Sequence, residues 1–501
     1  MKFSKNDQIV LYLSLVNLVF FHAPLYNFIL QNLNYYTFSG IFLILSISSL
    51  LLLANAFIFY LFFSISDTLG RIFTSLLFFL NIIAIHFINL YGIILDESMM
   101  ENIWNTNSQE AFAFISTEFI LFCLFFGSFT TFLSFRIKFP KTSLKILSIR
   151  FLFTLIITLL LVFSNGKNWL WVDKNAKHLG ALVLPWSYTV NSIRYFIHQA
   201  EKNEKEILLP NAKIKDSKKS IFILVIGESA RKDHFSLYGY SKNTNPILST
   251  LPNLAYFNAT AHATYTREGV KAILSHKDSP TPYESLPNYL YRNGVEVIWR
   301  TSNTGEPIAN FPNYQNVDQI HSSFPKLNKE YDAILLTNLK KEVLESKKDK
   351  IFVVLHTSTS HGPTYYKKYP LNFEVFKPVC SSVELSNCSQ QELFNAYDNT
   401  ILYTDFLLSE IIHEFKDLPA SVLFVSDHGE SLGENNLYMH GIPKSFAPKE
   451  QLEIPFLLWS SDSSIHYKSP EIVTQFHVFH TALKFLNIDS EVFQEDFSLI
   501  L

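Results

Sequence analysis

The stretch SVLFVSDHGESLGENNLYMHG, Ser421–Gly441, joins a strand pattern to a group of reactive side chains. Its apolar run Val422–Val425 is typical of a buried strand, and Asp427 and His428 follow almost directly. Ligand and catalytic groups in open α/β sheets lie just beyond the carboxyl ends of strands. Because Zn²⁺ takes Asp oxygen and His nitrogen, the pair is a candidate metal site, with His440 in a second polar cluster. Alone, the stretch fits equally well a turn in which Asp caps a helix and His is solvated.

Similar apolar runs recur through the second half of the chain. They are IFILVIG (221–227), VEVIWR (295–300), KIFVVLH (350–356), ASVLFVS (420–426) and IPFLLWS (454–460). Helix-like stretches such as 390–416 separate them. This alternation predicts an α/β domain with a largely parallel sheet and helices on both faces. A domain over 216–501 is long enough to bury a core of its own.

Further polar groups follow two of these runs. Glu228 comes after Gly227 at the end of the first, and His356 and His361 follow the third. Because the ends of parallel strands meet at one edge of a sheet, we expect these groups to lie near those of Ser421–Gly441. A catalytic zinc leaves one position open for water, substrate or a nucleophile.

Thr266 is the candidate nucleophile. It precedes REGVKAILSH, which can be helical, so Thr266 would lie at or near an N-cap. Backbone N–H groups at such a terminus stabilise a phosphate dianion, and zinc lowers the pKa of a bound hydroxyl. The spacing alone favours a plain N-cap threonine over a nucleophile.

The first third of the chain is expected to lie in a membrane. Hydrophobic residues make up 48% of the chain, charged residues 17%, and there are 47 Phe. The net charge of −3 gives no sign of a nucleic-acid partner. Five runs are each long enough to cross a bilayer core of about 30 Å. They are 9–30, 40–64, 71–95, 112–135 and 146–164.

Loop charges predict the orientation of these spans. Basic residues gather at the N-terminus and in the second–third and fourth–fifth loops, as Lys2, Lys5, Arg71, Arg136, Lys138, Lys141, Lys145 and Arg150. The other two loops are uncharged or acidic, which places the N-terminus in the cytoplasm. With five spans, the chain after residue 165 lies on the far side, which is the periplasm in a bacterium. Cys380 and Cys388 can then form a small-loop disulfide; in the cytoplasm they would be free thiols.

Two segments connect the membrane part with the α/β domain. In the loop 96–111, Asn102, Thr106 and Glu110 would lie on one face if the loop is helical. This spacing alone is more typical of a solvated amphipathic connector than of a binding face. Residues 166–215 form a linker in which 185–200 is an amphipathic helix along the membrane. We therefore divide the chain into a membrane domain (1–165), the linker (166–215) and a catalytic domain (216–501).

Several motifs are specific enough to suggest a family. They are IGESAR with the downstream LYGY and NTNP, HTSTSHGPTYY, CSQQELFNAYDNTILYTD, and SDHGESLGENNLYMHG. With the spans and linker, the chain resembles the bacterial phosphoethanolamine transferases that modify lipid A. That family (EptA/EptC type, including colistin-resistance enzymes) belongs to the alkaline phosphatase/sulfatase-like superfamily.

The resemblance implies roles for individual residues. Glu228, Thr266, Asp427 and His428 would bind a catalytic Zn²⁺, and Thr266 would also be the nucleophile. His361 and His440 would hold the phosphate or a second zinc. The remaining expected substrate contacts are His356, Asn303, Asn102, Thr106 and Glu110. A disulfide is expected between Cys380 and Cys388.

This sequence departs from the family pattern at two places. The family has a cysteine on each side of the nucleophile, where this chain has His262 and Ala272, so the local disulfide is absent. The family lysine four residues after the Asn303 position is Pro307 here. Arg300 is a candidate replacement for that cation.

The resemblance implies a two-step transfer at the periplasmic face of the inner membrane. Thr266 would take phosphoethanolamine from phosphatidylethanolamine and pass it to lipid A or another periplasmic acceptor, giving resistance to cationic antimicrobial peptides. The alternatives are a phosphoglycerol transferase or a sulfatase-like hydrolase. A transporter or sensor is the rival of a different class, but Asn81 and His86 are the only weak hints of a polar path in the spans.

Overall fold

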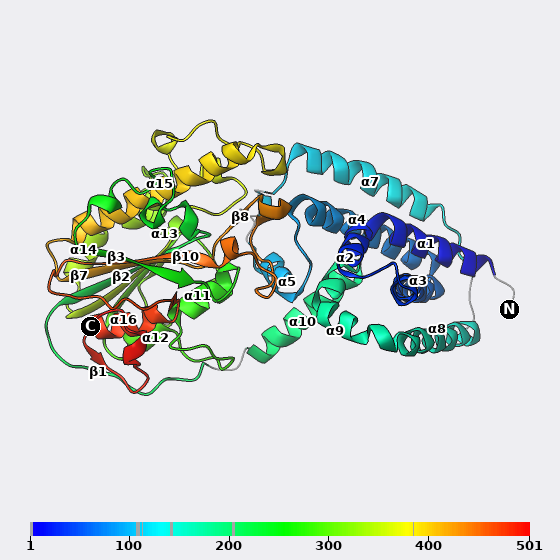
Figure 1. Cartoon of the computed structure of the whole chain (residues 1–501), viewed down its shortest axis with the longest axis horizontal. Helices are drawn as coiled ribbons and strands as arrows, with labels where there is room; N and C mark the ends of the chain where they lie inside the picture. The colour runs from blue at the N-terminus through cyan, green and yellow to red at the C-terminus, as the bar shows by residue number, and fades with distance from the viewer. Residues whose placement is uncertain (1–3, 107–110, 113, 141–143, 203–205, 384) are drawn as a thin grey trace. The chain divides into compact units, whose positions relative to one another are not determined.

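The computed structural model describes residues 4–106, 111–112, 114–140, 144–202, 206–383 and 385–501 (Figure 1). Its residues fall into two compact units, one of 1–104 with 115–199 and one of 105–114 with 200–501. Each unit is described separately. The predicted boundaries at 165 and 215 stay a prediction.

The first unit is helical and contains helices that suit a membrane. Four are long and apolar enough to span one: α3 (Phe38–Ile65), α4 (Asp67–Tyr91), α7 (Thr117–Phe135) and α8 (Leu144–Ser164). α1 (Lys5–Phe21) and α2 (Ala23–Asn32) meet at 63° and make a fifth span if the pair is counted as one. The predicted span 9–30 is therefore bent, at a point where Pro24, the second residue of α2, lacks the N–H that would continue the first helix. The chain is a multi-pass membrane protein.

Shorter helices complete this unit, namely α5 (Glu97–Asn105), α9 (Trp169–Leu182) and α10 (Trp186–Lys202). Asn102 lies in α5, but Thr106 lies beyond its end and Glu110 lies outside the described residues. The expectation that these residues share the face of one helix is therefore wrong for Asn102 and Thr106, because the helix stops at Asn105. Asn81 donates to Asn17 Oδ1 at 2.7 Å, so packing between helices accounts for it.

The second unit is built on an eight-stranded sheet with the order β11-β3-β10-β7-β2-β6-β4-β5. The strands are β2 (Ser220–Gly227), β3 (Leu254–Thr260), β4 (Glu296–Thr301), β5 (Tyr314–Asn316), β6 (Lys350–His356), β7 (Ala420–Ser426), β10 (Glu453–Ser460) and β11 (Val473–Thr474). β7, β2, β6, β4 and β5 are parallel, and β10 runs antiparallel to both neighbours. The predicted α/β fold with a mostly parallel sheet is confirmed. Two short pairs lie outside the sheet, β1 (Lys213–Ile214) with β12 (Ile488–Asp489) and β8 (Ser431–Leu432) with β9 (Tyr438–Met439).

Helices cover both faces of the sheet (Figure 1). The helices are α11 (Thr266–Leu274), α12 (Leu286–Arg292), α13 (Val317–Ser323), α14 (Leu339–Glu345), α15 (Gln390–Phe415) and α16 (His477–Phe485). Alternate residues of β2, Phe222, Leu224 and Ile226, enter a buried cluster with α11, α12 and α16. Because successive strand residues point to opposite faces, the other β2 residues point toward the α15 side, and the strand is buried throughout.

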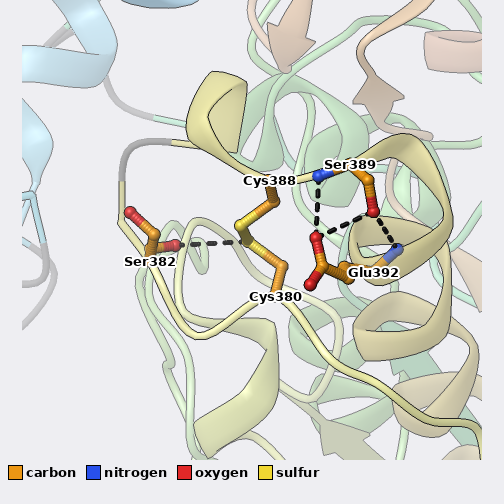
Figure 2. Close-up of a disulfide and its surroundings, with 5 residues drawn as sticks. All are labelled: Cys380, Ser382, Cys388, Ser389 and Glu392. Atoms are coloured by element: carbon orange, nitrogen blue, oxygen red, sulfur yellow. Dashed lines mark hydrogen bonds between the residues drawn. A yellow bond between two sulfur atoms is a disulfide. The ribbon is translucent and has the colours of Figure 1, made fainter.

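A disulfide joins Cys380 and Cys388, as predicted, just before α15 (Figure 2). Cys388 is followed by Ser389, which caps α15. Ser389 N donates to Glu392 Oε2 at 2.8 Å, and Glu392 N donates to Ser389 Oγ at 3.3 Å. The disulfide thus closes a small loop directly onto the start of a helix that covers the sheet.

We expect the double variant Cys380→Ser/Cys388→Ser to lower the free energy of unfolding of this unit by about 2–3 kcal/mol, from the loop entropy of its 8-residue separation. Thermal unfolding with and without reductant measures the loss. Cys123→Ser is the control, because that thiol is free. Equal melting temperatures for the double variant and the oxidised wild type would contradict this expectation.

Three buried histidines lie in or next to α16, and we expect them to make the unit sensitive to acid. Burial lowers the pKa of His276 and His477 to about 4 and also lowers that of His480. His480 Nδ1 accepts from Gln494 N at 3.1 Å, a bond that protonation would break.

Below pH 6.5 the unfolded chain therefore binds more protons than the folded one, so stability should fall as pH drops from about 6.5 toward 4. The melting temperature measured across this range should fall several degrees further for wild type than for His480→Gln. Parallel curves for the two proteins would show that His480 plays no part in this dependence.

Candidate active site

The carboxyl ends of β2 and β7 bring two candidate ligands together. These strands are parallel neighbours with Gly227 opposite Ser426, so Glu228 and Asp427 leave the sheet side by side. A Cβ at Gly227 would lie 2.6 Å from the Phe424 ring, which explains the glycine before Glu228. Both carboxylates are fully or almost fully buried. The predicted meeting of polar groups at this edge follows from the strand register.

Ser229 shapes the first of these turns. Its backbone has φ 52°, a left-handed conformation that is uncommon outside glycine. In this conformation its N–H donates to Asp427 Oδ1 at 3.0 Å and its hydroxyl donates to Glu228 Oε1 at 2.6 Å. One residue therefore orients both carboxylates.

His428 lies at the centre of the cluster. Its Nδ1 donates to the Gly429 carbonyl at 2.8 Å, so the neutral ring carries its lone pair on Nε2. Nε2 lies 3.4 Å from Glu228 Oε1 and 3.4 Å from Asp427 Oδ2. It also lies 3.4 Å from Thr266 Oγ1.

Thr266 is the first residue of α11, as the sequence predicts for a residue at or near the helix start. Its Oγ1 donates to Glu228 Oε2 at 3.2 Å. The nearby Thr264 hydroxyl points elsewhere, because it donates to the Ile442 carbonyl at 2.6 Å. Of these two threonines, only Thr266 has its hydroxyl among the candidate ligands.

A second group of side chains adjoins the first. The His440 ring lies 4.3 Å from the ring of His428 and 5.4 Å from that of His361, measured between centroids. His440 Nδ1 lies 3.2 Å from Glu430 Oε2. Burial and the neighbouring His428 lower the pKa of His440 to about 3, so its imidazole is neutral at neutral pH and has a nitrogen lone pair for a cation.

Asn303 and His356 border the cluster from β4 and β6. Asn303 Nδ2 donates to Glu228 Oε2 at 2.6 Å and to the Thr357 carbonyl at 2.9 Å. His356 is fully buried and its Nδ1 donates to Glu306 Oε1 at 2.9 Å. The other ring nitrogen of His356, Nε2, is buried and has no hydrogen-bond partner among the described residues. The predicted contact of His356 with substrate stays a prediction.

Arg300 does not replace the family lysine. It is buried, and its guanidinium donates to Glu342 and to the carbonyls of Leu335 and Thr337. These hydrogen bonds hold the guanidinium beside β4, away from the candidate ligands. The predicted contacts of Asn102 and Thr106 with a headgroup also stay predictions.

The donor set fits a divalent cation such as zinc. Glu228, His428 and His440 each offer a ligand atom, and these atoms lie within 4.8 Å of one another. Asp427 Oδ2 is buried without a hydrogen-bond partner. Among the described residues, neither Glu228 nor Asp427 pairs with Lys or Arg. Burial and the Glu228 carboxylate raise the pKa of Asp427, a cost that a bound cation would relieve.

Hydrogen bonds hold the nucleophile loop where the family has a disulfide. Gly441 N donates to the Thr264 carbonyl at 2.8 Å, next to the bond from the Thr264 hydroxyl to Ile442. Ala261 N donates to the Leu452 carbonyl at 2.8 Å. The segment after His440 thus supports the segment before Thr266.

Sequence reasoning missed four residues of this region. Ser229 directly follows Glu228, and Glu430 lies two residues after His428, so closeness in sequence to predicted ligands could have indicated both. Glu306 and Gln475 reach the site through loop geometry, and no local pattern marks them.

Comparisons with known proteins agree with this architecture. Residues 220–488 match the family described as Sulfatase, and residues 15–200 match the family described as Phosphoethanolamine transferase EptA/EptB. Phosphoethanolamine transferase EptA of Helicobacter pylori is 38% identical over 94% of this chain and 91% of its own length.

Two solved structures are also similar. The lipooligosaccharide phosphoethanolamine transferase A (EptA) from Neisseria meningitidis has a TM-score of 0.87, with 22% identity over 99% of this chain and 98% of its own. The C-terminal periplasmic domain of phosphoethanolamine transferase EptC from Campylobacter jejuni has a TM-score of 0.53, with 34% identity over 59% of this chain and 97% of its own.

Proposed function

Because the chain belongs to the phosphoethanolamine transferases of the EptA type, with a sulfatase-family domain, we propose that it moves phosphoethanolamine from phosphatidylethanolamine to lipid A. The observation that carries the proposal is the position of the Thr266 hydroxyl. It starts a helix and lies within 3.4 Å of both Glu228 and His428.

The proposed mechanism has two displacements at phosphorus. Glu228 orients the Thr266 hydroxyl by accepting its hydrogen. Thr266 Oγ1 attacks the phosphorus of the donor, the bond from phosphorus to the diacylglycerol oxygen breaks, and the hydroxyl proton passes to that departing oxygen. The acceptor oxygen then attacks the phosphorus of the phosphoethanolamine–Thr266 ester, the bond from phosphorus to Oγ1 breaks, and the acceptor's proton returns to Thr266.

The surrounding residues favour this chemistry. The amino terminus of α11 presents backbone N–H groups and the positive end of its dipole to the phosphoryl oxygens. His361 and His440 lie at the same end of the cluster and are proposed to hold the phosphate. Asn303, which donates to Glu228, is proposed to contact the phosphoethanolamine group.

Zinc is the metal proposed for the site, with Glu228, Thr266, Asp427 and His428 as its ligands. When bound there, a zinc ion would lower the pKa of the hydroxyl and offset charge on the phosphoryl oxygens. The residues present fit such an ion, as indicated by the buried Asp427 oxygen that has no hydrogen-bond partner.

The proposed location is the bacterial inner membrane, with the N-terminus in the cytoplasm and the catalytic unit in the periplasm. The loop charges support it, and so does the similarity of the second unit to the C-terminal periplasmic domain of EptC from Campylobacter jejuni. The Cys380–Cys388 disulfide is consistent with that oxidising compartment. Placing an amine on lipid A reduces its negative charge, so the activity would lower the binding of cationic peptides such as polymyxin.

A donor assay on the purified full-length protein tests the proposed function against its alternatives. Labelled phosphatidylethanolamine should yield diacylglycerol and modified lipid A, whereas phosphatidylglycerol and an aryl sulfate should not react. Turnover of phosphatidylglycerol or the sulfate instead would assign the chain to the phosphoglycerol transferases or the hydrolases. Lipid A mass spectra with and without the gene identify the acceptor.

A further inference from the structure

Two separate segments have to be held in register for this site to work. One is the loop His262–Thr266 with the nucleophile, and the other is the turn Ser426–His428 with two candidate ligands. The chain has three cysteines, of which Cys380 and Cys388 are joined to each other and Cys123 lies in α7. No disulfide can therefore join the two segments.

Gln475 bridges these two segments. It follows β11 and precedes α16 in the chain, and it is fully buried. Oε1 accepts from His262 N at 2.8 Å, while Nε2 donates to the Ser426 carbonyl at 3.0 Å and to the Asp427 carbonyl at 2.6 Å. Only this orientation of the amide gives a donor to both carbonyls and an acceptor to the N–H.

The bridge is set by the fold on each side. β11 pairs with β3 with Thr474 opposite Thr260, so Gln475 follows β11 as Ala261 and His262 follow β3. α11 also packs closely against the Asp427 carbonyl, which accepts from Gln475. A Cβ at Gly269 would lie 2.4 Å from the Asp427 carbonyl oxygen, so this contact requires glycine. The Asp427 peptide is thereby clamped between the nucleophile helix and the Gln475 amide.

We infer that Gln475 is a positioning residue for the transfer reaction, which sets the distance between the Thr266 hydroxyl and the ligands Asp427 and His428. The inference rests on the proposed function. Gln475 touches neither substrate nor metal in this account; it acts through the backbone of both segments. A misplacement of about 1 Å between reacting groups can slow a reaction about 10²-fold. A residue that holds such a distance can therefore have a large effect on the rate.

Gln475→Leu removes all three hydrogen bonds at nearly constant volume. We expect kcat for transfer from phosphatidylethanolamine to fall about 10- to 100-fold while the donor KM changes little. KM should hold because the residues proposed to contact the donor are not those that Gln475 binds. The same substitution at an exposed position of this unit, Gln494→Leu, should keep the wild-type kcat.

Gln475→Asn is the second variant, measured beside the first in full-length protein. It keeps the amide but shortens the side chain by one carbon, so it cannot span both segments. It should be folded at the assay temperature, with a melting temperature lowered by the broken hydrogen bonds, and should still lose kcat at unchanged KM. This result separates positioning from stability, and it serves if Gln475→Leu does not fold.

A wild-type kcat in folded Gln475→Asn, or a loss confined to KM, would overturn the inference. The wild-type reaction in the same assay reports separately on the proposed function. If wild type transfers nothing from phosphatidylethanolamine, that function is wrong. If wild type is active and Gln475→Asn matches it, only the role of Gln475 is wrong.

Discussion

Thr266→Ala should reduce transfer from phosphatidylethanolamine by at least about 10³-fold, because the variant lacks the oxygen that forms the covalent ester. The structure places that oxygen 3.2 Å from Glu228 Oε2 and 3.4 Å from His428 Nε2, at the first residue of α11. Fold and stability should change little, since Tyr265 is the N-cap residue and the Thr266 hydroxyl caps no helix. The rate of diacylglycerol release is the measurement.

Two further variants make this result specific. Thr266→Ser keeps a hydroxyl and should retain part of the activity. Thr264→Ala removes the hydroxyl that binds the Ile442 carbonyl, and should lose no more than about tenfold through loosening of the loop. A loss in Thr264→Ala that equals the loss in Thr266→Ala would move the nucleophile to the other threonine.

His428→Gln should cost at least about 10²-fold in transfer rate and should remove most of the bound zinc. His428 Nε2 lies 3.4 Å from oxygens of Glu228, Asp427 and Thr266, so this nitrogen is the point that the proposed ligands share. Without this imidazole the site loses one proposed metal ligand. The buried carboxylates of Glu228 and Asp427 then repel each other with less bound positive charge to offset them.

Metal content by elemental analysis and the transfer rate are measured on the same preparations. His466→Gln, an exposed histidine of the same unit, is the control and should keep both. Chelator treatment of wild type should reproduce the loss, and added zinc should restore the rate. A His428→Gln protein with full metal content and full activity would contradict the assignment of this ligand.

The sheet and the position of the site could be predicted because each rests on a local pattern. The runs ending at Gly227, His356 and Ser426 are buried strands, and parallel pairing in register brings Glu228 beside Asp427. Family motifs added Asn303 as a contact for phosphoethanolamine, which stays a prediction; in the structure its side chain donates to Glu228. The position of Thr266 at a helix start also followed from local sequence.

Other features depend on distant contacts that no local pattern encodes. β3 has a mixed burial pattern, and its pairing with β10 and β11 is visible only in the folded sheet. Gln475 reaches Asp427 only because β11 lies beside β3. Arg300 was a reasonable cation for the site by sequence distance, but it is engaged with Glu342 instead. The bend between α1 and α2 is marked only by a single proline in an otherwise apolar run.

In the proposed reaction, phosphoethanolamine passes through Thr266. The most direct test is the mass of full-length protein after incubation with phosphatidylethanolamine and no acceptor, followed by peptide mapping. Wild type should gain the mass of one phosphoethanolamine group on the peptide with Thr266 and lose it when lipid A is added, and Thr266→Ala should gain nothing. Transfer to lipid A without any such adduct, or an adduct on another residue, would contradict the account.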